Sequence, residues 1–183
     1  MQIRRETPAD RSAADDVQVR AFGDKEGPRI ARLLASLRAL PAWEADRALV
    51  AEQDGEIVGS TLCTRSRLDA PRRLVDVAVL SPVAIAPGHQ GQGIGSALVR
   101  ATIEEMAKTS APLLFLEGNP NFYRRFGFVA GGSLGFRKPS LRIPDAGFQV
   151  VKLPAYEDWM SGTLVYDQAF WDNDCVGLRD PQA

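Results

Sequence analysis

A glycine-rich segment in the middle of the chain has the residue types that are needed to hold an anion. It reads Pro87-Gly88-His89-Gln90-Gly91-Gln92-Gly93-Ile94-Gly95-Ser96, after an apolar run and before a helical pattern. Glycines between a strand and a helix gather successive backbone N–H groups around an anion, and the helix dipole adds to the attraction. Because side chains would block that approach, glycine is the residue that this geometry requires. The segment therefore predicts a phosphate-binding loop.

Several kinds of loop compete for this segment. A P-loop needs Gly-Lys followed by Ser or Thr, and no lysine follows these glycines. The dinucleotide fingerprint GxGxxG needs a spacing that Gly91, Gly93 and Gly95 do not have. A tight turn without a ligand would need fewer glycines. The pattern that remains is Gln90 followed by Gly93 and Gly95, directly after a strand.

A second segment, about thirty residues downstream, places a tyrosine on a short predicted helix. It reads Asn119-Pro120-Asn121-Phe122-Tyr123-Arg124-Arg125-Phe126-Gly127-Phe128. Tyr123 stands four residues before Gly127, which is expected to end the helix. Taken alone, the tyrosine would more often pack in an aromatic cluster with the neighbouring phenylalanines.

Together the two segments resemble the GNAT superfamily of N-acetyltransferases. The pyrophosphate loop of that family is a Gln or Arg, any two residues, Gly, any residue, and Gly or Ala. Gln90-Gly91-Gln92-Gly93-Ile94-Gly95 matches this pattern fully. Tyr123 and Gly127 have the spacing of the family's tyrosine element, and Asn119 resembles the asparagine that often begins it. The likeness covers residues 75–128 and is closest to a bacterial subgroup of predicted acetyltransferases.

The resemblance implies an N-acetyltransferase that passes acetyl directly from acetyl-CoA to an amine, with no metal. The implied cofactor-binding residues are Val83, Ala84, Ile85, Gln90, Gly91, Gln92, Gly93, Ile94, Gly95, Ser96, Asn119 and Tyr123. The loop would hold the pyrophosphate, and the backbone of the preceding strand would hold the pantetheine. Tyr123 would protonate the departing sulfur, because a phenol has a pKa near ~10 and a thiol near ~8.5. Such help is worth roughly 10²–10⁴-fold in rate.

The group that removes the proton of the amine is less clearly marked in the sequence. Glu117, at the end of the strand before the tyrosine segment, is the first candidate for this catalytic role. Asp76, Glu26 and Glu52 are more typical of solvated surface carboxylates. Because no base is obvious, the alternative function is a non-catalytic module that binds or senses acyl-CoA. The sequence does not select the acceptor, whose pocket we expect to involve residues 22–43 and 137–147.

The order of the predicted elements is β-α-α-β-β-β-α-β-α-β-β, which indicates an α/β fold, a mixed sheet with helices on both faces. Expected strands cover 2–6, 47–53, 56–65, 75–85, 113–117, 148–152 and 163–166, and expected helices begin at 7, 28, 94 and 120. Thr7 is the predicted N-cap of the first helix. Ser81-Pro82 interrupts the long strand 75–85, which predicts a bulge or the point where it leaves its neighbour. In the GNAT family the sheet is splayed at that place.

Length and composition agree with one soluble domain over residues 1–183. The chain has 45% hydrophobic and 25% charged residues, as in ordinary globular proteins. A net charge of −1 gives no reason to expect nucleic acid or a membrane as a partner. Two cysteines and one histidine cannot supply a usual four-ligand zinc site. We expect a cytoplasmic protein and, by analogy with the family, a possible homodimer formed through the C-terminal strands.

Overall fold

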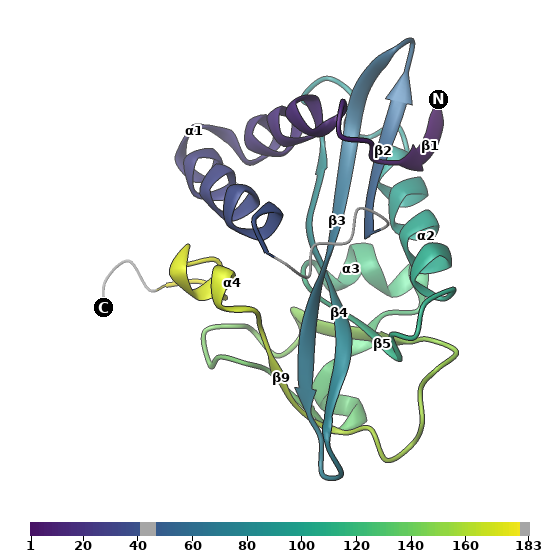
Figure 1. The fold of residues 1–183 in the computed structure, drawn as a ribbon, viewed down its shortest axis with the longest axis vertical. Coiled ribbons are helices and arrows are strands. Elements are labelled where there is room, and N and C mark those ends of the chain that lie inside the picture. The colour runs from purple at the N-terminus through teal and green to yellow at the C-terminus, as the bar shows by residue number, and fades with distance from the viewer. Residues whose placement is uncertain (41–46, 180–183) are drawn as a thin grey trace. The chain divides into compact units, whose positions relative to one another are not determined.

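The computed structural model describes residues 1–40 and 47–179, so part of the expected acceptor region 22–43 lies outside the described residues. The strands are β1 (Gln2–Arg5), β2 (Ala48–Gln53), β3 (Glu56–Asp69), β4 (Leu74–Ile85), β5 (Leu113–Glu117), β6 (Val129–Ala130), β7 (Phe136–Arg137), β8 (Phe148–Lys152) and β9 (Gly162–Val165). The helices are α1 (Arg11–Arg38), α2 (Ile94–Met106), α3 (Pro120–Tyr123) and α4 (Gln168–Asp172), with 3₁₀ turns η2 (Arg124–Phe126) and η3 (Gly131–Leu134) (Figure 1).

The chain divides into two compact units. The first unit comprises Met1–Thr64 and Leu80–Lys108, and the second comprises Arg65–Val79 and Thr109–Ala183. Strands β3 and β4 each contribute residues to both units. We therefore keep the prediction of a single domain over the whole chain as a proposal, because two continuous strands connect the units.

In the first unit, β1 and β3 pair antiparallel with β2 on its two edges. The β2–β3 hairpin closes at Asp54 and Gly55, whose φ angles of 54° and 83° are those of a tight hairpin turn. The register shifts between Ala51 and Glu52, which leaves Val58 as an extra residue on β3. The hairpin expected from Asp54-Gly55 is confirmed.

Helices cover both faces of the sheet in the first unit. Ala84 of β4 packs with Val17 of α1, whereas the next residue, Ile85, packs with the cluster that contains Leu98 of α2. Successive residues of a strand point to opposite faces, so α1 and α2 lie on opposite sides of β4. Figure 1 shows the two helices on either side of β2 and β3. The predicted mixed sheet with helices on both faces is confirmed.

The start of the first helix differs from the prediction. Helix α1 begins at Arg11 and its N-cap position is Asp10, not Thr7. The backbone N–H and the hydroxyl of Thr7 both donate to Asp10 Oδ2, at 2.8 and 2.6 Å. The hydroxyl that was expected to cap the helix is therefore hydrogen-bonded to the Asp10 carboxylate instead. The expected break between two helices is present as a kink at Gly23, where φ is 73° and ψ is 179°.

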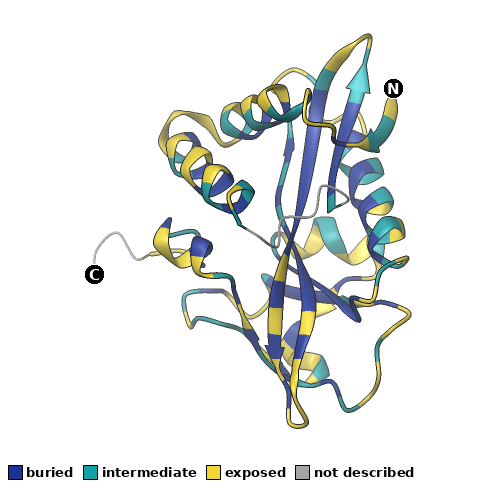
Figure 2. Ribbon diagram, in the orientation of Figure 1, coloured by how far each residue is buried: buried dark blue, intermediate teal, exposed yellow. Residues whose placement is uncertain are grey.

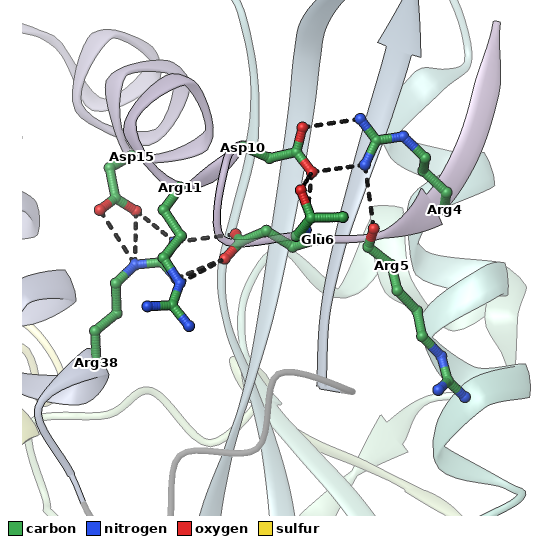
Figure 3. A network of polar contacts seen from close by, with 8 residues as sticks. Arg4, Arg5, Glu6, Asp10, Arg11, Asp15 and Arg38 are labelled. Carbon is green, nitrogen blue, oxygen red and sulfur yellow. Dashed lines mark hydrogen bonds and ion pairs between the residues drawn. The ribbon is translucent and has the colours of Figure 1, made fainter.

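A network of charged side chains ties the two halves of α1 to the end of β1 (Figure 3). Arg38, in the last turn of α1, donates to both carboxylate oxygens of Glu6 at 2.6 and 2.9 Å. It also donates to Asp15, in the first half of the helix, with a shortest distance of 2.7 Å. The side chains of Arg38 and Glu6 are only 12% and 3% exposed. Arg38 therefore holds the helix folded back on itself.

Replacement of Arg38 by methionine should cost about 3–5 kcal/mol of unfolding free energy, because it removes both hydrogen bonds to the buried Glu6 carboxylate and leaves it only the ion pair with Arg11 at 3.9 Å. The control is Arg20→Met, which removes an exposed ion pair with Asp16 at 3.2 Å. Such surface pairs contribute about 0–1 kcal/mol. Urea unfolding followed by circular dichroism measures both values. Equal losses in the two variants would contradict the structural role of Arg38.

The second unit is built around β5, which pairs parallel with β4 at Ala78 and Val79 and antiparallel with β8. Strand β8 also pairs antiparallel with β6, and β9 pairs antiparallel with β3 and parallel with β7. The ring of Phe115 stacks on Phe148 at 5.6 Å and meets Phe136 edge-on at 5.3 Å. These rings form an aromatic core under the mixed sheet.

The pairing of β4 with β5 involves residues that directly precede Ser81-Pro82, whose peptide bond is cis. The predicted departure of the strand from its neighbour near this dipeptide stays a prediction. Strands β6 and β7, of two residues each, and helix α4 were not expected from the sequence. No helix among the described residues is long and apolar enough to cross a membrane.

Candidate active site

The glycine loop of the first unit follows β4 and begins α2. Gly88, Gly91 and Gly93 have φ angles of 90°, 77° and 84°. These left-handed conformations cost roughly 1–2 kcal/mol for residues with a side chain, so glycine is required at all three positions. Gly93 is the N-cap of α2, and the helix starts at Ile94 as predicted.

The loop leaves open space on its surface. A Cβ atom built on Gly88, Gly91 or Gly93 would meet no other protein atom within 4 Å. The left-handed φ angles, and not packing, therefore account for glycine at these positions, and the space beside them is open. A bare backbone with space above it is what an anion needs in order to reach the N–H groups. The loop fits a phosphate group on this ground.

Side-chain amides and a strand contact hold the loop in shape. Gln90 Nε2 donates to the carbonyl of Ile85 at 3.2 Å, and Gln92 Nε2 donates to the carbonyl of Gly88 at 3.1 Å. The N–H of Ala86 donates to the carbonyl of Val58 at 2.9 Å, which fixes the end of β4. Both glutamines are exposed, so their amides stabilise the loop from its surface.

The start of α2 favours a bound anion. The first N–H groups of a helix have no partner within the helix, and the helix dipole places partial positive charge there. The first turn of α2 carries no acidic side chain that would compete for these donors. Ile94 and Leu98 are buried against Leu49 of β2, which fixes the direction of the helix.

The predicted cofactor-binding residues of β4, the strand before the loop, differ in how far they are buried. Ala84 is buried against α1, whereas Val83 and Ile85 are half-buried. Their backbone contacts with pantetheine stay a prediction. His89 is half-buried, and its backbone N–H donates to the carbonyl of Ala86 at 3.0 Å.

The tyrosine segment of the second unit forms the predicted short helix. Asn119 is the N-cap of α3, and its Oδ1 accepts a hydrogen bond from the N–H of Asn121 at 2.9 Å. Pro120 follows at the first helical position, where its missing N–H costs nothing. Gly127 ends the following 3₁₀ turn with a φ of 87°. Asn119 thus has a structural role as the cap of α3. Its predicted contact with the cofactor would be a second role.

The ring of Tyr123 is held by aromatic neighbours and by a glycine. It lies 4.8 Å from the ring of Phe122 and 5.8 Å from that of Phe128, both edge-on. A Cβ atom on Gly118 would collide with its Cε2 atom. Burial raises the pKa of Tyr123 to about 12. The phenol therefore keeps its proton at neutral pH, as a proton donor must.

We expect Gly118→Ala to lower kcat about 10–100-fold, because the added methyl group displaces the Tyr123 ring and small misplacements of a catalytic group are costly. The affinity for acetyl-CoA, measured by calorimetry, should stay within about 3-fold of the unchanged protein. Gly132→Ala is the matched control, since a Cβ there meets nothing within 4 Å. A kcat unchanged by Gly118→Ala would show that the ring position is not critical.

Glu117, the predicted proton acceptor, lies at the end of β5 in a network with two distant segments. The hydroxyl of Tyr166 donates to its Oε1 at 2.8 Å, and the N–H of Gly177 donates to its Oε2 at 3.1 Å. Burial raises the pKa of Glu117, although Tyr166, Gly177 and the charge of Arg142 act in the opposite direction. Burial and the Glu117 carboxylate also raise the pKa of Tyr166 well above its ordinary value.

The predicted site residues are distributed over the two units. The loop and Val83–Ile85 belong to the first unit, whereas Glu117, Asn119 and Tyr123 belong to the second. Sequence reasoning missed the contact of Gly118 with Tyr123 and the bond of Tyr166 to Glu117. Gly118 was visible as the glycine before the Asn-Pro pair, but nothing local linked Tyr166 to a residue 49 positions earlier.

The first unit has the strand, glycine loop and helix of a protein that binds a phosphate-bearing molecule. The chain belongs to the GNAT acetyltransferase family, because the model of the acetyltransferase (GNAT) domain matches residues 2–131. The match covers the glycine loop and the tyrosine segment. It confirms the family that the two sequence motifs indicated.

Relatives and solved structures agree with this membership. The uncharacterized N-acetyltransferase YjhQ of Escherichia coli K12 is 33% identical over 133 residues, 72% of this chain and 71% of that protein. The fold is similar to the GNAT N-acetyltransferase YhbS of Escherichia coli, solved with CoA (TM-score 0.76, 23% identity, 92% of this chain and 91% of that chain). It is also similar to a GNAT acetyltransferase of Brucella melitensis, solved with acetyl-CoA (TM-score 0.67, 28% identity, 92% and 97%).

Proposed function

We propose that the protein is an N-acetyltransferase that transfers acetyl from acetyl-CoA to an amine. The observation that carries the proposal is the loop, in which Gly88, Gly91 and Gly93 leave bare backbone beside the start of a helix. Membership of the GNAT family and the CoA-bound and acetyl-CoA-bound neighbours support acetyl-CoA as the donor. The amine as acceptor rests on the family resemblance.

In this proposal the first unit binds the donor. The N–H groups of Gln90–Ser96 would hold the pyrophosphate, and their partial positive charge offsets its negative charge. The backbone of Val83–Ile85 would hold the pantetheine arm by strand-like hydrogen bonds. The amides of Gln90 and Gln92 already bond within the protein, so we assign them to shaping the loop.

The second unit would supply the proton transfers. When the amine nitrogen bonds to the acetyl carbon, the carbon–sulfur bond breaks and the sulfur needs a proton. Tyr123 would donate this proton, because the phenol is protonated at neutral pH; its raised pKa also makes it a weaker acid, so the transfer requires that the sulfur has gained negative charge. Glu117 would accept the proton that the amine loses. Each of its oxygens has a second lone pair beside the bond from Tyr166 or Gly177.

The raised pKa of Glu117 leads to a pH prediction. A base works only when deprotonated, so kcat/KM should fall as the pH drops through the raised pKa of Glu117, above the ordinary value of about 4.3 for Glu. In Glu117→Gln this acid limb should disappear, together with most of the activity. A pH profile of kcat/KM between pH 5 and pH 9 tests this. An unchanged acid limb in the variant would exclude Glu117 as the base.

The first test of the proposed function is calorimetric titration of the purified protein with acetyl-CoA, beside ATP and NAD as controls. Selective binding of acetyl-CoA in the micromolar range supports the loop assignment. A panel of small amines, amino acids and lysine peptides is then assayed for release of the CoA thiol. Binding with only slow hydrolysis across the panel would favour an acyl-CoA-sensing module instead. A folded protein that does not bind acetyl-CoA would refute the proposal.

The cytoplasmic location and the possible homodimer also stay proposals. Within the described residues, Cys63 and Cys175 are not joined by a disulfide. Cys63 is buried, and burial raises the pKa of its thiol to about 12, so it is expected to be unreactive. Sizing chromatography with light scattering would measure the number of copies in solution.

A further inference from the structure

A surface recess of about 360 Å³ lies in the second unit, where three strands end together. Its lining residues are Asp69, Ala70, Pro71, Gly135, Arg137, Ser161 and Gly162. They come from the end of β3, from β7 and from the beginning of β9. The adjoining tip of the β3–β4 hairpin is largely exposed (Figure 2). The proposed chemistry assigns no role to these residues.

Strand register places two oppositely charged lining residues, Asp69 and Arg137, on one face of the sheet. Thr163 of β9 is the partner of Asp69 on β3 and also of Arg137 on β7. Residues that are paired across strands point to the same face of a sheet. Asp69 and Arg137 therefore flank Thr163 on one face, two strand spacings apart, with their Cα atoms about 10 Å from each other.

Neither charge is neutralised by a described residue. Arg137 donates from Nε to the hydroxyl of Thr163 at 2.9 Å, which orients its guanidinium across β9 and leaves its two terminal amino groups available. The carboxylate of Asp69 makes no hydrogen bond or ion pair with any residue in the described part of the chain. Other exposed charges on the hairpin are paired, as Asp76 is with Arg65. The carboxylate of Asp69 and the guanidinium of Arg137, both lining residues of the recess, thus remain available to bind a ligand.

Contacts beside the recess connect the hairpin tip to the segment before β9. Arg72 and Arg73, at the hairpin tip, lie 5.2 and 5.3 Å above the ring of Trp159, in the loop before β9. Gly162 has a φ of 144°, and a Cβ atom there would collide with the backbone carbonyl of Asp69. The close approach of these two strands requires glycine. The charged groups are therefore held on rigid elements, as binding groups need to be.

We propose that this recess binds a small zwitterion, namely an amino acid whose carboxylate pairs with Arg137 and whose ammonium pairs with Asp69. Its volume falls within the range of small-molecule sites, about 300–1,000 Å³. The planar guanidinium matches a carboxylate with two parallel hydrogen bonds. The carboxylate on the other side of Thr163 disfavours a plain anion and favours a ligand that also carries a positive charge. This inference goes beyond the proposed function, because it does not require transfer of acetyl to the ligand.

The test is direct titration of the full chain without acetyl-CoA, by calorimetry or by NMR shifts of the Trp159 indole. The probes are glycine, L-glutamine, β-alanine and 4-aminobutyrate, with acetate and ethylamine as ligands that carry only one charge. At least one amino acid should bind, and acetate and ethylamine should bind at least about 10-fold more weakly. The series also measures the separation of the two charges that fits best.

Two variants and a matched control decide the result. Arg137→Met and Asp69→Asn should each weaken amino-acid binding about 10-fold or more. Arg20→Met is the control, since this exposed arginine of α1 belongs to the first unit, does not line the recess and should leave binding unchanged. Circular dichroism checks that all three variants are folded. Absence of binding to the unchanged protein, or binding that ignores both recess variants, would overturn the proposal. Tight acetate binding that ignores Asp69→Asn would also overturn it.

Discussion

Gly93→Glu should abolish acetyl-CoA binding, with a loss of at least about 100-fold in affinity measured by calorimetry. Gly93 is the N-cap of α2, and its Cβ direction points into open space above the loop. A glutamate side chain there would occupy the space assigned to the pyrophosphate and would repel its charge. Removal of a charged contact in a binding site costs about 2–5 kcal/mol, and the variant combines that loss with repulsion.

Two controls separate this effect from backbone strain. Gly55 has a φ of 83°, close to the 84° of Gly93, and a Cβ on either glycine meets nothing within 4 Å. Gly55→Glu therefore imposes the same strain and the same charge at the β2–β3 turn, and it should bind acetyl-CoA normally. Gly93→Gln keeps the size of the side chain without its charge, so it should lose less affinity than Gly93→Glu.

Either of two results would contradict the loop assignment. The first is retained acetyl-CoA binding in Gly93→Glu. The second is an equal loss of binding in Gly55→Glu with the protein still folded, because the effect would then not be local to the loop. Thermal unfolding of both variants, followed by circular dichroism, shows whether each one has kept its fold.

Those parts of the fold that depend on local patterns could be predicted from the sequence. Strand β5 covers Leu113–Glu117 as expected, because a short apolar run lies between turn residues. The beginning of α2 at Ile94 was predicted because the helical period of apolar residues starts there, directly after Gly93. The hairpin at Asp54-Gly55 followed from the known preference of tight turns for this pair.

Features that depend on competition or on distant partners could not be predicted. Thr7 is a suitable N-cap by type, yet its hydroxyl donates to Asp10, which occupies the N-cap position without a side-chain capping hydrogen bond. The two-residue strands β6 and β7 are too short for any periodicity to reveal them. Their positions follow from pairing with β8 and β9, which lie later in the chain.

The candidate site shows the same division. The glycine loop and Tyr123 carry their chemistry in contiguous segments, so their spacing was sufficient to propose them. The partners of Glu117 lie 49 and 60 residues away in sequence, and only the folded chain brings their donors to the carboxylate. Asp69 and Arg137 become neighbours of one residue, Thr163, solely through the register of three strands.

Tyr123→Phe should lower kcat by about 10²–10⁴-fold and leave the affinity for acetyl-CoA nearly unchanged. The variant removes only the hydroxyl, and the ring keeps its contacts with Phe122 and Phe128. The step that loses its proton donor is the departure of sulfur, whereas binding of the donor depends on the loop of the first unit. Steady-state rates with an accepted amine, together with calorimetry, separate the two effects.

The matched control is Tyr156→Phe, which removes a phenol hydroxyl elsewhere in the second unit, where the ring packs under Lys152 at 4.0 Å. It should leave kcat within about 2-fold of the unchanged protein. Because burial raises the pKa of Tyr123 to about 12, loss of its proton should not limit the rate below about pH 11. An alkaline limb near pH 8–9 would therefore come from another group.

The meaning of an unchanged kcat in Tyr123→Phe depends on which step limits the rate. If release of product is limiting, loss of the acid is hidden in kcat, and single-turnover measurements with saturating enzyme are needed to expose the chemical step. An unchanged single-turnover rate would remove Tyr123 from the acid role. The proton would then reach the sulfur from water, and the pKa of Tyr123 would reflect the burial of its ring alone.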